Sequence, residues 1–341
     1  MSQESPIIFS FSGGNALGAY HGGVYDALCE AGVQPDWIIG ASIGAVTGAI
    51  IAGNPPEERL NALRRYWRLA CIDSPPPPPW IDPERYNGAH LLQALLLGRP
   101  GLFGSRFPGP LSLLPGMPDD VAMLDHHPME ATLHRFVDFE RLNGGEVRLT
   151  IGCLDIETGE EVYFDSSRDR ITARHLLAST GVMPLFPPVE IDGRLLGDLV
   201  YRNNMPLDVG LTEMAEREVT CIASELFTIQ GRRPIDLPGT LDRGLDLLCA
   251  GQTQRTVEAL RREHALRGQL GLPGKIDMLH VVHRAAPDER HGKALNFAGP
   301  VLAERWRSGL SDMRAALARW RGQARQDRFT YIGPVRDAAS S

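Results

Sequence analysis

The sequence predicts an α/β protein with a mostly parallel central sheet and helices on both faces. Two observations near the N-terminus support this fold class. Residues 7–11 and 37–39 are short apolar runs of the kind that form buried strands. Each run is followed by a glycine-containing turn and then by a helical pattern. Consecutive strand–helix units with apolar strands are typical of a parallel sheet that is covered on both faces.

The first unit begins with a strand expected at Ile7–Phe11, which leads directly into the turn Ser12-Gly13-Gly14-Asn15-Ala16-Leu17-Gly18. A helix is expected from about residue 17 to residue 31, ending near Gly32. A glycine turn that opens a helix presents backbone N–H groups that no helical carbonyl uses, and such groups bind anions. The turn is therefore either a phosphate cradle or an oxyanion hole.

The second unit contains Gly40-Ala41-Ser42-Ile43-Gly44 between the strand at 37–39 and a helix expected over residues 45–52. A G-x-S-x-G at such a turn is strained and lifts the serine hydroxyl above the sheet edge, at the positive end of the helix. Gly40 and Gly44 let the backbone approach itself closely. The pattern predicts Ser42 as a nucleophile, and a tight turn with an incidental serine is the alternative.

This serine turn favours one function for the first glycine turn. The Rossmann pattern requires G-x-G-x-x-G, which residues 13–18 do not match, and no Walker lysine follows. Because a serine turn lies on the next strand, we favour an oxyanion hole. Its expected donors are the backbone amides of Gly13, Gly14 and Asn15.

The segments SGGNALGAYHGGVYDAL (residues 12–28) and PDWIIGASIGAVTGAIIAGNPPEERL (residues 35–60) resemble the patatin-like phospholipase family. The resemblance runs from Ile7 to Leu207 and is strongest to bacterial members with a similar opening and a C-terminal extension. It implies a patatin-like fold and a serine–aspartate dyad that hydrolyses lipid esters. Asn15 stands where the family usually has a third glycine, and asparagine is the other residue that best tolerates a positive φ.

The resemblance implies that Asp198 is the catalytic aspartate. The family usually has Asp-Gly-Gly or Asp-Gly-Ala and then Asn-x-Pro-Leu. Here Asp198 and the run Asn204-Met205-Pro206-Leu207 fall in register, with Leu199 and Val200 in place of the small residues. Asp192 is the alternative aspartate. A carboxylate that takes the serine proton directly is a weak base unless burial raises its pKa.

A catalytic triad would need a histidine after Asp198. His280 and His283 lie on a strand expected at Lys275–His283, and the order Ser–Asp–His fits an α/β-hydrolase. We favour structural roles for both, because no loop signature surrounds them. As a metal pair they lack a third ligand, so neither a metal nor an organic cofactor is expected. His21 is expected on the pocket rim or on a helix face.

The remaining elements follow in chain order. Asn54 and Glu57 predict the start of a helix whose buried face carries Leu60, Leu63, Trp67 and Ala70. A hairpin is expected from residues 147–156 and 161–164, a helix end at residues 176–180 and a strand at residues 218–226. A long helix over residues 240–270 carries the apolar residues Leu241, Leu245, Leu248 and Ala259.

Residues 73–127 interrupt this pattern as an insertion. Residues 74–80 include five consecutive prolines, and residues 98–117 are rich in glycine, proline, leucine and phenylalanine. The apolar content of residues 91–114 predicts either a lid or acyl-chain lining that touches a membrane, or a segment packed on the core. We divide the chain into a catalytic domain, residues 1–210, and a C-terminal extension, residues 211–341, packed on it.

The end of the extension is a basic helical pattern over residues 303–328, with seven arginines and three acidic residues. An apolar stripe repeats at helical spacing through Trp306, Leu310, Met313, Leu317 and Trp320. The stripe predicts a core contact with a solvated basic face. Binding of anionic lipid by that face is the alternative.

Composition narrows the function classes. The 341 residues carry a net charge of −7, which argues against nucleic acid as a partner. Five cysteines without a C-x-x-C predict reduced thiols in the cytoplasm. The N-terminus lacks the pattern of a signal peptide, and no apolar run approaches the roughly 20 residues of a spanning helix. Any membrane contact is expected to be peripheral.

The function expected from these features is hydrolysis of a carboxylic ester in a lipid, namely a phospholipid or lysophospholipid acyl chain. Two alternatives remain open. Asn15, Leu199 and Val200 suggest a lipid-binding or regulatory protein with weak or lost catalysis. A thioesterase or acyltransferase would use the same dyad.

Overall fold

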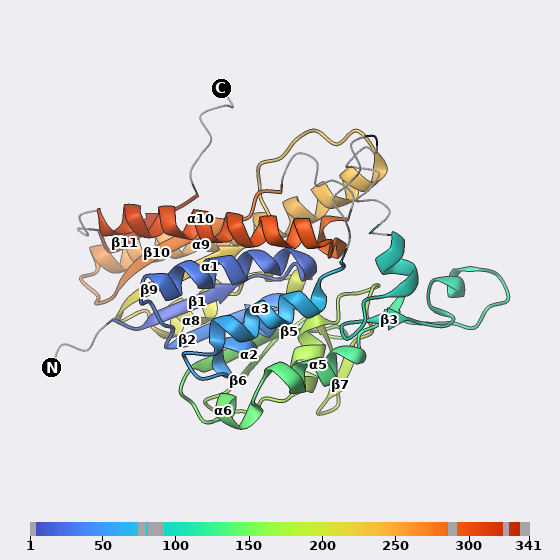
Figure 1. Cartoon of the computed structure of the whole chain (residues 1–341). Coiled ribbons are helices and arrows are strands. Elements are labelled where there is room, and N and C mark those ends of the chain that lie inside the picture. The colour runs from blue at the N-terminus through green and yellow to red at the C-terminus, as the bar shows by residue number, and fades with distance from the viewer. Residues whose placement is uncertain are drawn as a thin grey trace.

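A mostly parallel sheet organises the chain (Figure 1). The computed structural model describes residues 5–73, 80, 90, 92–285, 292–322 and 327–334. Within these residues, nine strands form one sheet in the order β11-β10-β9-β1-β2-β5-β8-β7, with β6 paired to β5. All pairs from β11 to β5 are parallel, and β6, β7 and β8 are antiparallel to their neighbours. The predicted α/β fold class is confirmed.

The two N-terminal units form the centre of the sheet. Strand β1 (Ile7–Phe11) is followed by the 3₁₀ helix η1 (Asn15–Gly18) and α1 (Ala19–Glu30). Strand β2 (Trp37–Ala41) is followed by α2 (Ile43–Ala52). β1 pairs with β2 on one side and with β9 (Glu218–Glu225) on the other. Both predicted units are therefore present with nearly the predicted bounds.

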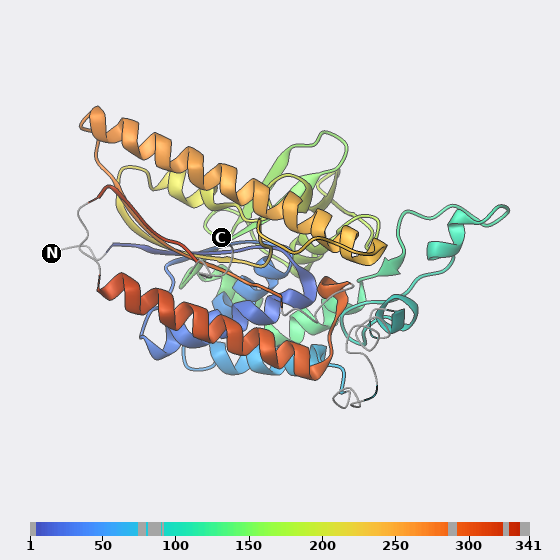
Figure 2. The ribbon, with the colours of Figure 1, turned by 90° about the horizontal axis from the view of Figure 1, so that it is seen from above.

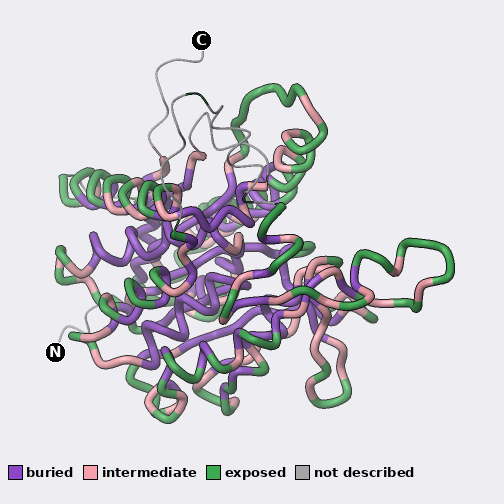
Figure 3. The backbone as a smooth tube through the Cα atoms, turned by 45° about the vertical axis from the view of Figure 1, so that its right-hand side comes forward, coloured by how far each residue is buried: buried purple, intermediate pink, exposed green. Residues whose placement is uncertain are grey.

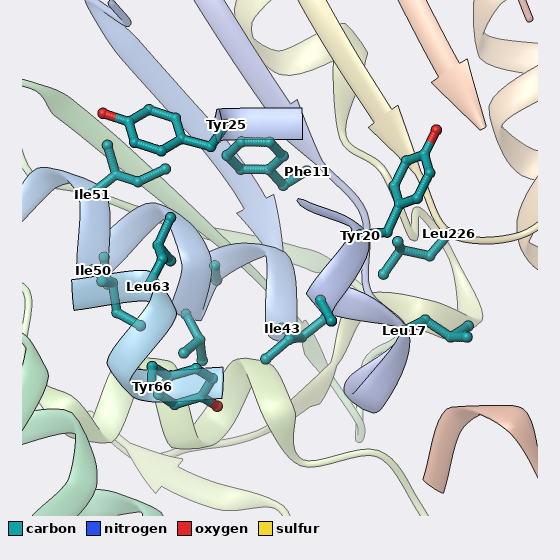
Figure 4. Close-up of a cluster of buried hydrophobic side chains, with 14 of the residues drawn as sticks. Phe11, Leu17, Tyr20, Tyr25, Ile43, Ile50, Ile51, Leu63, Tyr66 and Leu226 are labelled. Atoms are coloured by element: carbon teal, nitrogen blue, oxygen red, sulfur yellow. The ribbon is translucent and has the colours of Figure 1, made fainter. Parts of the chain in front are cut away.

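Side chains of β1 alternate between two apolar layers, as the pleat of a strand requires. Phe9 and Phe11 enter the larger cluster, under α1, α2 and α3 (Arg59–Ala70). Ile8 enters the cluster on the opposite face, with α8 (Leu207–Glu213) and α9 (Leu237–Gln269). Figure 4 shows part of the larger cluster, where Phe11, Tyr25 and Ile51 are drawn among other buried side chains. The apolar character of β1 thus reflects burial on both faces.

The far edge of the sheet is antiparallel. β5 (Arg148–Asp155) and β6 (Glu161–Asp165) form the predicted hairpin. α7 (Ala173–Thr180) precedes a second hairpin of β7 (Val189–Ile191) and β8 (Arg194–Asp198), and β8 pairs with β5. The short helices α5 (Pro128–Phe136) and α6 (Phe139–Asn143) precede β5.

One predicted helix start is wrong. α3 spans Arg59–Ala70 and begins after Glu58, not after Asn54. The Asn54 side-chain amide instead donates to the carbonyls of Ile50, at 2.8 Å, and Phe136, at 2.7 Å. Asn54 therefore bridges two helix ends, a contact that depends on distant sequence. The predicted buried face of α3 is confirmed for Leu63, Trp67 and Ala70, and Leu60 is half-buried.

The C-terminal extension continues the same sheet. α8 (Leu207–Glu213) leads to β9, and α9 (Leu237–Gln269), β10 (Lys275–Val282), α10 (Gly299–Arg321) and β11 (Phe329–Ile332) follow. In Figure 2, α9 and α10 lie on opposite sides of the strands. The sequence pattern missed β11, because it extended the last helix to residue 328. Since β9 hydrogen-bonds β1, we propose that residues 1–210 and the extension unfold as one unit.

The apolar stripe of α10 packs against the rest of the chain, as predicted. Met313 and Leu317 are buried in the larger cluster, and Trp306, Leu310 and Trp320 pack against it. The basic face is solvated as predicted at Arg307, Arg314, Arg319 and Arg321, and Arg305 is the exception among the described arginines of α10. Arg305 is fully buried and donates to the carbonyls of Lys293 and Asn296.

The insertion forms an arm that extends from the body and is largely exposed (Figure 3). It contains a helical turn at residues 92–97, the two-stranded ladder of β3 (Gly104–Ser105) and β4 (Leu124–Asp125), and the 3₁₀ helix η2 (Gly109–Leu113) between them. Leu102 and Phe103, at its base, are buried in the core. The predicted polyproline run, residues 75–79, lies outside the described residues.

None of the helices among the described residues has the length and apolar content to span a bilayer.

The packing of α10 on α1 generates a stability prediction. A Cβ at Gly23, on α1, would lie 1.9 Å from the Trp306 carbonyl oxygen, whereas a Cβ at Gly244, on α9, meets nothing within 4 Å. We expect Gly23→Ala to lower the free energy of unfolding by about 1–3 kcal/mol or more, because two helix backbones must separate. Gly244→Ala should be neutral or raise it by up to about 1 kcal/mol. Urea unfolding measures both.

A single cooperative transition is expected for both variants and for the wild-type chain. A separate early transition for the extension would contradict the proposed single unit. Equal stability of the two glycine variants would contradict the close packing of α10 on α1.

Candidate active site

Ser42 lies at a strained turn between β2 and α2. Its backbone has φ 53° and ψ −126°, a conformation that non-glycine residues rarely adopt. The turn is also tightly packed, because a Cβ at Gly44 would lie 2.2 Å from the Phe11 carbonyl oxygen and one at Gly40 would lie 2.5 Å from the Gly44 carbonyl carbon. The two flanking glycines thus provide the close approach that the sequence predicted.

A second serine supports this turn. The Ser42 amide donates to Ser179 Oγ at 2.9 Å, and Ser179 Oγ donates to the Gly152 carbonyl at 2.7 Å. Ser179 is on α7 and Gly152 is on β5. The turn is therefore attached to the antiparallel side of the sheet. The sequence contained no signal for this role of Ser179.

Asp198 ends β8 and faces Ser42. Its buried carboxylate accepts a hydrogen bond from the Val200 amide at 2.9 Å. Burial raises the pKa of Asp198 to about 6, although the nearby Ser42 hydroxyl and the Val200 amide favour the charged form. The structure therefore brings the two predicted dyad residues close together. Asp192, the alternative aspartate, lies in the exposed turn between β7 and β8.

The two bulky residues after Asp198 pack in apolar clusters. Leu199 is fully buried in a small cluster with Ala41 and Leu154. Val200 lies in the larger core cluster and donates its amide to Asp198. Both residues are accommodated by packing, and the Ser42 hydroxyl still interacts with the Asp198 carboxylate beside them.

The glycine turn after β1 lies against Ser42. A Cβ at Gly13 would come 3.0 Å from the Ser42 Cβ and 2.5 Å from Asn204 Oδ1. Asn15 has a φ of 51°, as expected for an asparagine in place of a glycine. The Gly13 amide donates to the Asn204 carbonyl at 3.1 Å, whereas the amides of Gly14 and Asn15 have no acceptor among the described residues. Of the three predicted donors, two are thus available to a ligand.

The His21 ring holds the start of the glycine turn by a hydrogen bond. Its Nε2 lies 2.9 Å from the Ser12 carbonyl oxygen, so this nitrogen carries the proton, and its Nδ1 lies 2.8 Å from the Ser224 hydroxyl. Burial lowers the pKa of His21 to about 4, which keeps the ring neutral. His21 is fully buried on α1, which agrees with the alternative of a helix-face residue and not with a position on the pocket rim.

Gln252, on α9, hydrogen-bonds to two backbone groups of the segment that follows Asp198. Its Oε1 accepts from the Asn204 backbone amide at 2.8 Å, and its Nε2 donates to the Val200 carbonyl at 2.9 Å. Asn204 in turn donates through Nδ2 to the Gly13 carbonyl, at 3.3 Å. One buried amide of the extension thus links the aspartate segment to the glycine turn. No motif marks Gln252, so the sequence analysis missed it.

The two histidines on β10 have other partners. His280 lies 3.0 Å from Glu225 Oε2 through Nε2 and 2.9 Å from the Tyr331 hydroxyl through Nδ1. The ring of His283 lies 5.2 Å from that of Tyr20. Burial raises the pKa of Asp198, the Ser42 hydroxyl and the Val200 amide lower it, and no histidine that the structure describes contributes to it. Among the described residues, no three His, Cys, Asp or Glu side chains are grouped to hold a metal ion.

Comparison with protein-family models decides the family. The model for patatin-like phospholipases matches residues 9–211, which is more than half of the chain. The chain belongs to the patatin-like phospholipase family. A second model, DUF3734, described as patatin phospholipase, matches residues 252–328 of the extension. Membership of the family implies lipid acyl hydrolase activity.

Solved structures with similar architecture are more distant. VipD from Legionella pneumophila has a TM-score of 0.45 and 16% sequence identity, over 93% of this chain and 67% of that one. Full-length ExoU in complex with SpcU, from the type III secretion system of Pseudomonas aeruginosa, has a TM-score of 0.36 and 15% identity, over 94% and 53%. This chain therefore spans about half of the ExoU chain. Comparison with curated proteins gives no significant match.

The contacts of Gln252 generate a prediction with a matched control. Gln252→Leu should lower the free energy of unfolding by about 1–3 kcal/mol, because it leaves the Asn204 amide and the Val200 carbonyl without partners. It should also lower kcat for a water-soluble ester, on the order of tenfold, because the carboxylate is positioned less well. Gln254→Leu, on the exposed face of the same helix, should change neither quantity.

The kcat of both variants should be measured at a temperature at which each variant is folded. If Gln252→Leu kept the wild-type kcat there, Gln252 would serve stability alone.

Proposed function

We propose that this protein hydrolyses carboxylic esters of phospholipids or lysophospholipids through a Ser42–Asp198 dyad. The observation that carries the proposal is the proximity of the Ser42 hydroxyl, at a strained strand–helix turn, to the buried Asp198 carboxylate, whose pKa it lowers. A hydroxyl is a poor nucleophile until an adjacent base can take its proton. The raised pKa of Asp198, about 6, makes this carboxylate a stronger base than an exposed aspartate.

The reaction has two steps. In the first, Ser42 Oγ attacks the acyl carbonyl carbon while Asp198 takes its proton, and the bond to the leaving alcohol breaks as the proton is passed to that oxygen. In the second, Asp198 takes a proton from water, which attacks the acyl-enzyme. The fatty acid leaves and the proton returns to Ser42.

The negative charge on the carbonyl oxygen is stabilised by backbone donors. The amides of Gly14 and Asn15 are available next to Ser42, and the N-terminus of α2 adds its positive dipole end. The loss of one such donor typically lowers kcat by roughly 100–1,000-fold. A dyad without imidazole depends strongly on these donors.

The geometry favours this function over the alternative of a binding protein with lost catalysis. That alternative was motivated by Asn15, Leu199 and Val200. Asn15 adopts the positive φ that its position needs, and Leu199 is packed in a buried cluster with Ala41 and Leu154. A thioesterase or acyltransferase would use the same atoms, so a panel of oxygen and thiol esters with water or alcohol acceptors separates these activities.

The first test of the dyad uses a fluorophosphonate probe and an ester substrate. Wild-type protein should be labelled at Ser42, and Ser42→Ala should lose both labelling and hydrolysis. Asp198→Asn should lower kcat by about 10³-fold or more, because an amide cannot take the proton. Asp192→Asn is the matched control and should keep wild-type activity. Absence of labelling on folded wild-type protein would instead support the binding protein.

The second test is the pH dependence of kcat/KM on a soluble ester. Asp198 acts as a base only when deprotonated, and its pKa is raised to about 6. The rate should therefore be half-maximal near pH 6, fall about tenfold per pH unit below it and be level above it. A profile that stayed level down to pH 4 would contradict a direct role for this carboxylate.

A further inference from the structure

Many exposed apolar side chains belong to two segments at the end of the molecule where the parallel strands end. The segments are distant in sequence, residues 92–121 of the arm and residues 229–248 around the start of α9. We call the exposed apolar side chains of these two segments the apolar rim. Its most exposed members are Leu97, Phe107, Leu113, Val121, Ile235 and Leu237. Three leucines that helped predict α9 from the sequence, Leu241, Leu245 and Leu248, therefore belong to an exposed surface.

Both segments flank the candidate active site. The parallel strands end at this edge, and Figures 1 and 2 show the arm and the start of α9 at the same end of the molecule. At the base of the arm, the backbone amides of Met123 and Leu124 donate hydrogen bonds to the carbonyls of Pro184 and Leu185. These two residues lie in the segment that precedes Asp198. On the other side, a Cβ at Gly14 would contact Leu226, three residues before Ile229.

Polar contacts hold the start of α9 in place, so its exposed apolar side chains have a fixed backbone position. The Asp236 carboxylate caps the helix through the Gly239 amide at 2.8 Å. Arg243 donates to the carbonyls of Thr228 and Ile229, which holds the preceding loop. Apolar surface that is presented in this way and lies beside a site is typical of a contact with a partner or a membrane.

The charge of the apolar rim indicates which kind of partner binds to it. The arm segment has two arginines and two aspartates, and the α9 segment has three of each, whereas the whole chain carries −7. The rim is therefore neutral as well as apolar, and this character matches the interface of a phospholipid bilayer better than a charged partner.

We propose that the apolar rim docks on a phospholipid bilayer and brings the Ser42 site to it. This proposal rests on the proposed function, which requires a lipid ester.

The docking is apolar, and it differs from the electrostatic contact through α10 that the sequence left open. Several arginines of α10 are engaged within the protein. Arg305 is buried, Arg314 pairs with Glu30 at 2.6 Å, and Arg319 donates to the Gly333 carbonyl at 2.8 Å. Binding through the rim should therefore persist at high salt and on vesicles without anionic lipid.

The test measures cosedimentation of Ser42→Ala protein with vesicles of phosphatidylcholine alone, and of phosphatidylcholine with phosphatidylglycerol. The Ser42→Ala background keeps the vesicles intact and separates binding from catalysis. Binding to both vesicle types is expected at low and at high salt. Leu113→Asp or Leu237→Asp should weaken it on the order of tenfold or more, because each removes an apolar anchor and adds a charge.

The matched control is Leu270→Asp, at the opposite end of the chain segment that forms α9. Leu237 and Leu270 are 72% and 73% exposed, so the two substitutions differ in position rather than in exposure. Leu270→Asp should bind as the parent does, and thermal unfolding checks that all variants are folded.

Four outcomes would overturn the docking proposal. Three concern vesicle binding: its absence, its loss at high salt, and an equal loss of binding in Leu270→Asp and Leu237→Asp. The fourth is a dimer in solution that Leu237→Asp dissociates, which would assign the rim to a second copy of the chain. Failure of the proposed function appears elsewhere, as absence of fluorophosphonate labelling in the wild type. The two failures are therefore distinguishable.

Discussion

The interaction between the Ser42 hydroxyl and the Asp198 carboxylate is the one on which the site depends. It joins the central parallel part of the sheet to its antiparallel edge, because Ser42 follows β2 and Asp198 ends β8. β5 lies between these strands and pairs with both. Its register therefore sets the separation of the two side chains, and burial of the carboxylate at this junction raises its pKa.

Strain at Ser42 is offset by packing around it. The positive φ of this residue is held by the Ser179 hydroxyl on one side and by the turn after β1 on the other, where the approach is too close for a side chain at Gly44 or Gly13. The neutral ring of His21 fixes the same turn from below. The site is thus assembled from short loops whose positions depend on a rigid sheet, so small displacements of the sheet would alter the reacting geometry.

The extension contributes to the site as well as to the sheet. Its strand β9 neighbours β1, and Gln252 of α9 connects the Asp198 segment with the segment that contacts Gly13. The start of the same helix carries half of the apolar rim. One helix therefore combines support of the dyad with the surface that we assign to the bilayer, and this explains why its N-terminal leucines remain exposed.

Local pattern in the sequence determined the two strand–helix units and the serine turn with Ser42, because each depends on neighbouring residues alone. The resemblance to the patatin-like family, and not local pattern, singled out Asp198 and the glycine-like position of Asn15. Only the tertiary structure decided that the side chains of Ser42 and Asp198 meet, that Gly13 gives its amide to Asn204, and that Ser179, His21 and Gln252 support the turns. These contacts join residues between 9 and 191 positions apart, and no local periodicity records such pairings. The exposure of the α9 leucines was hidden for the same reason, since a helical apolar pattern does not specify whether a protein core or a lipid surface will cover it.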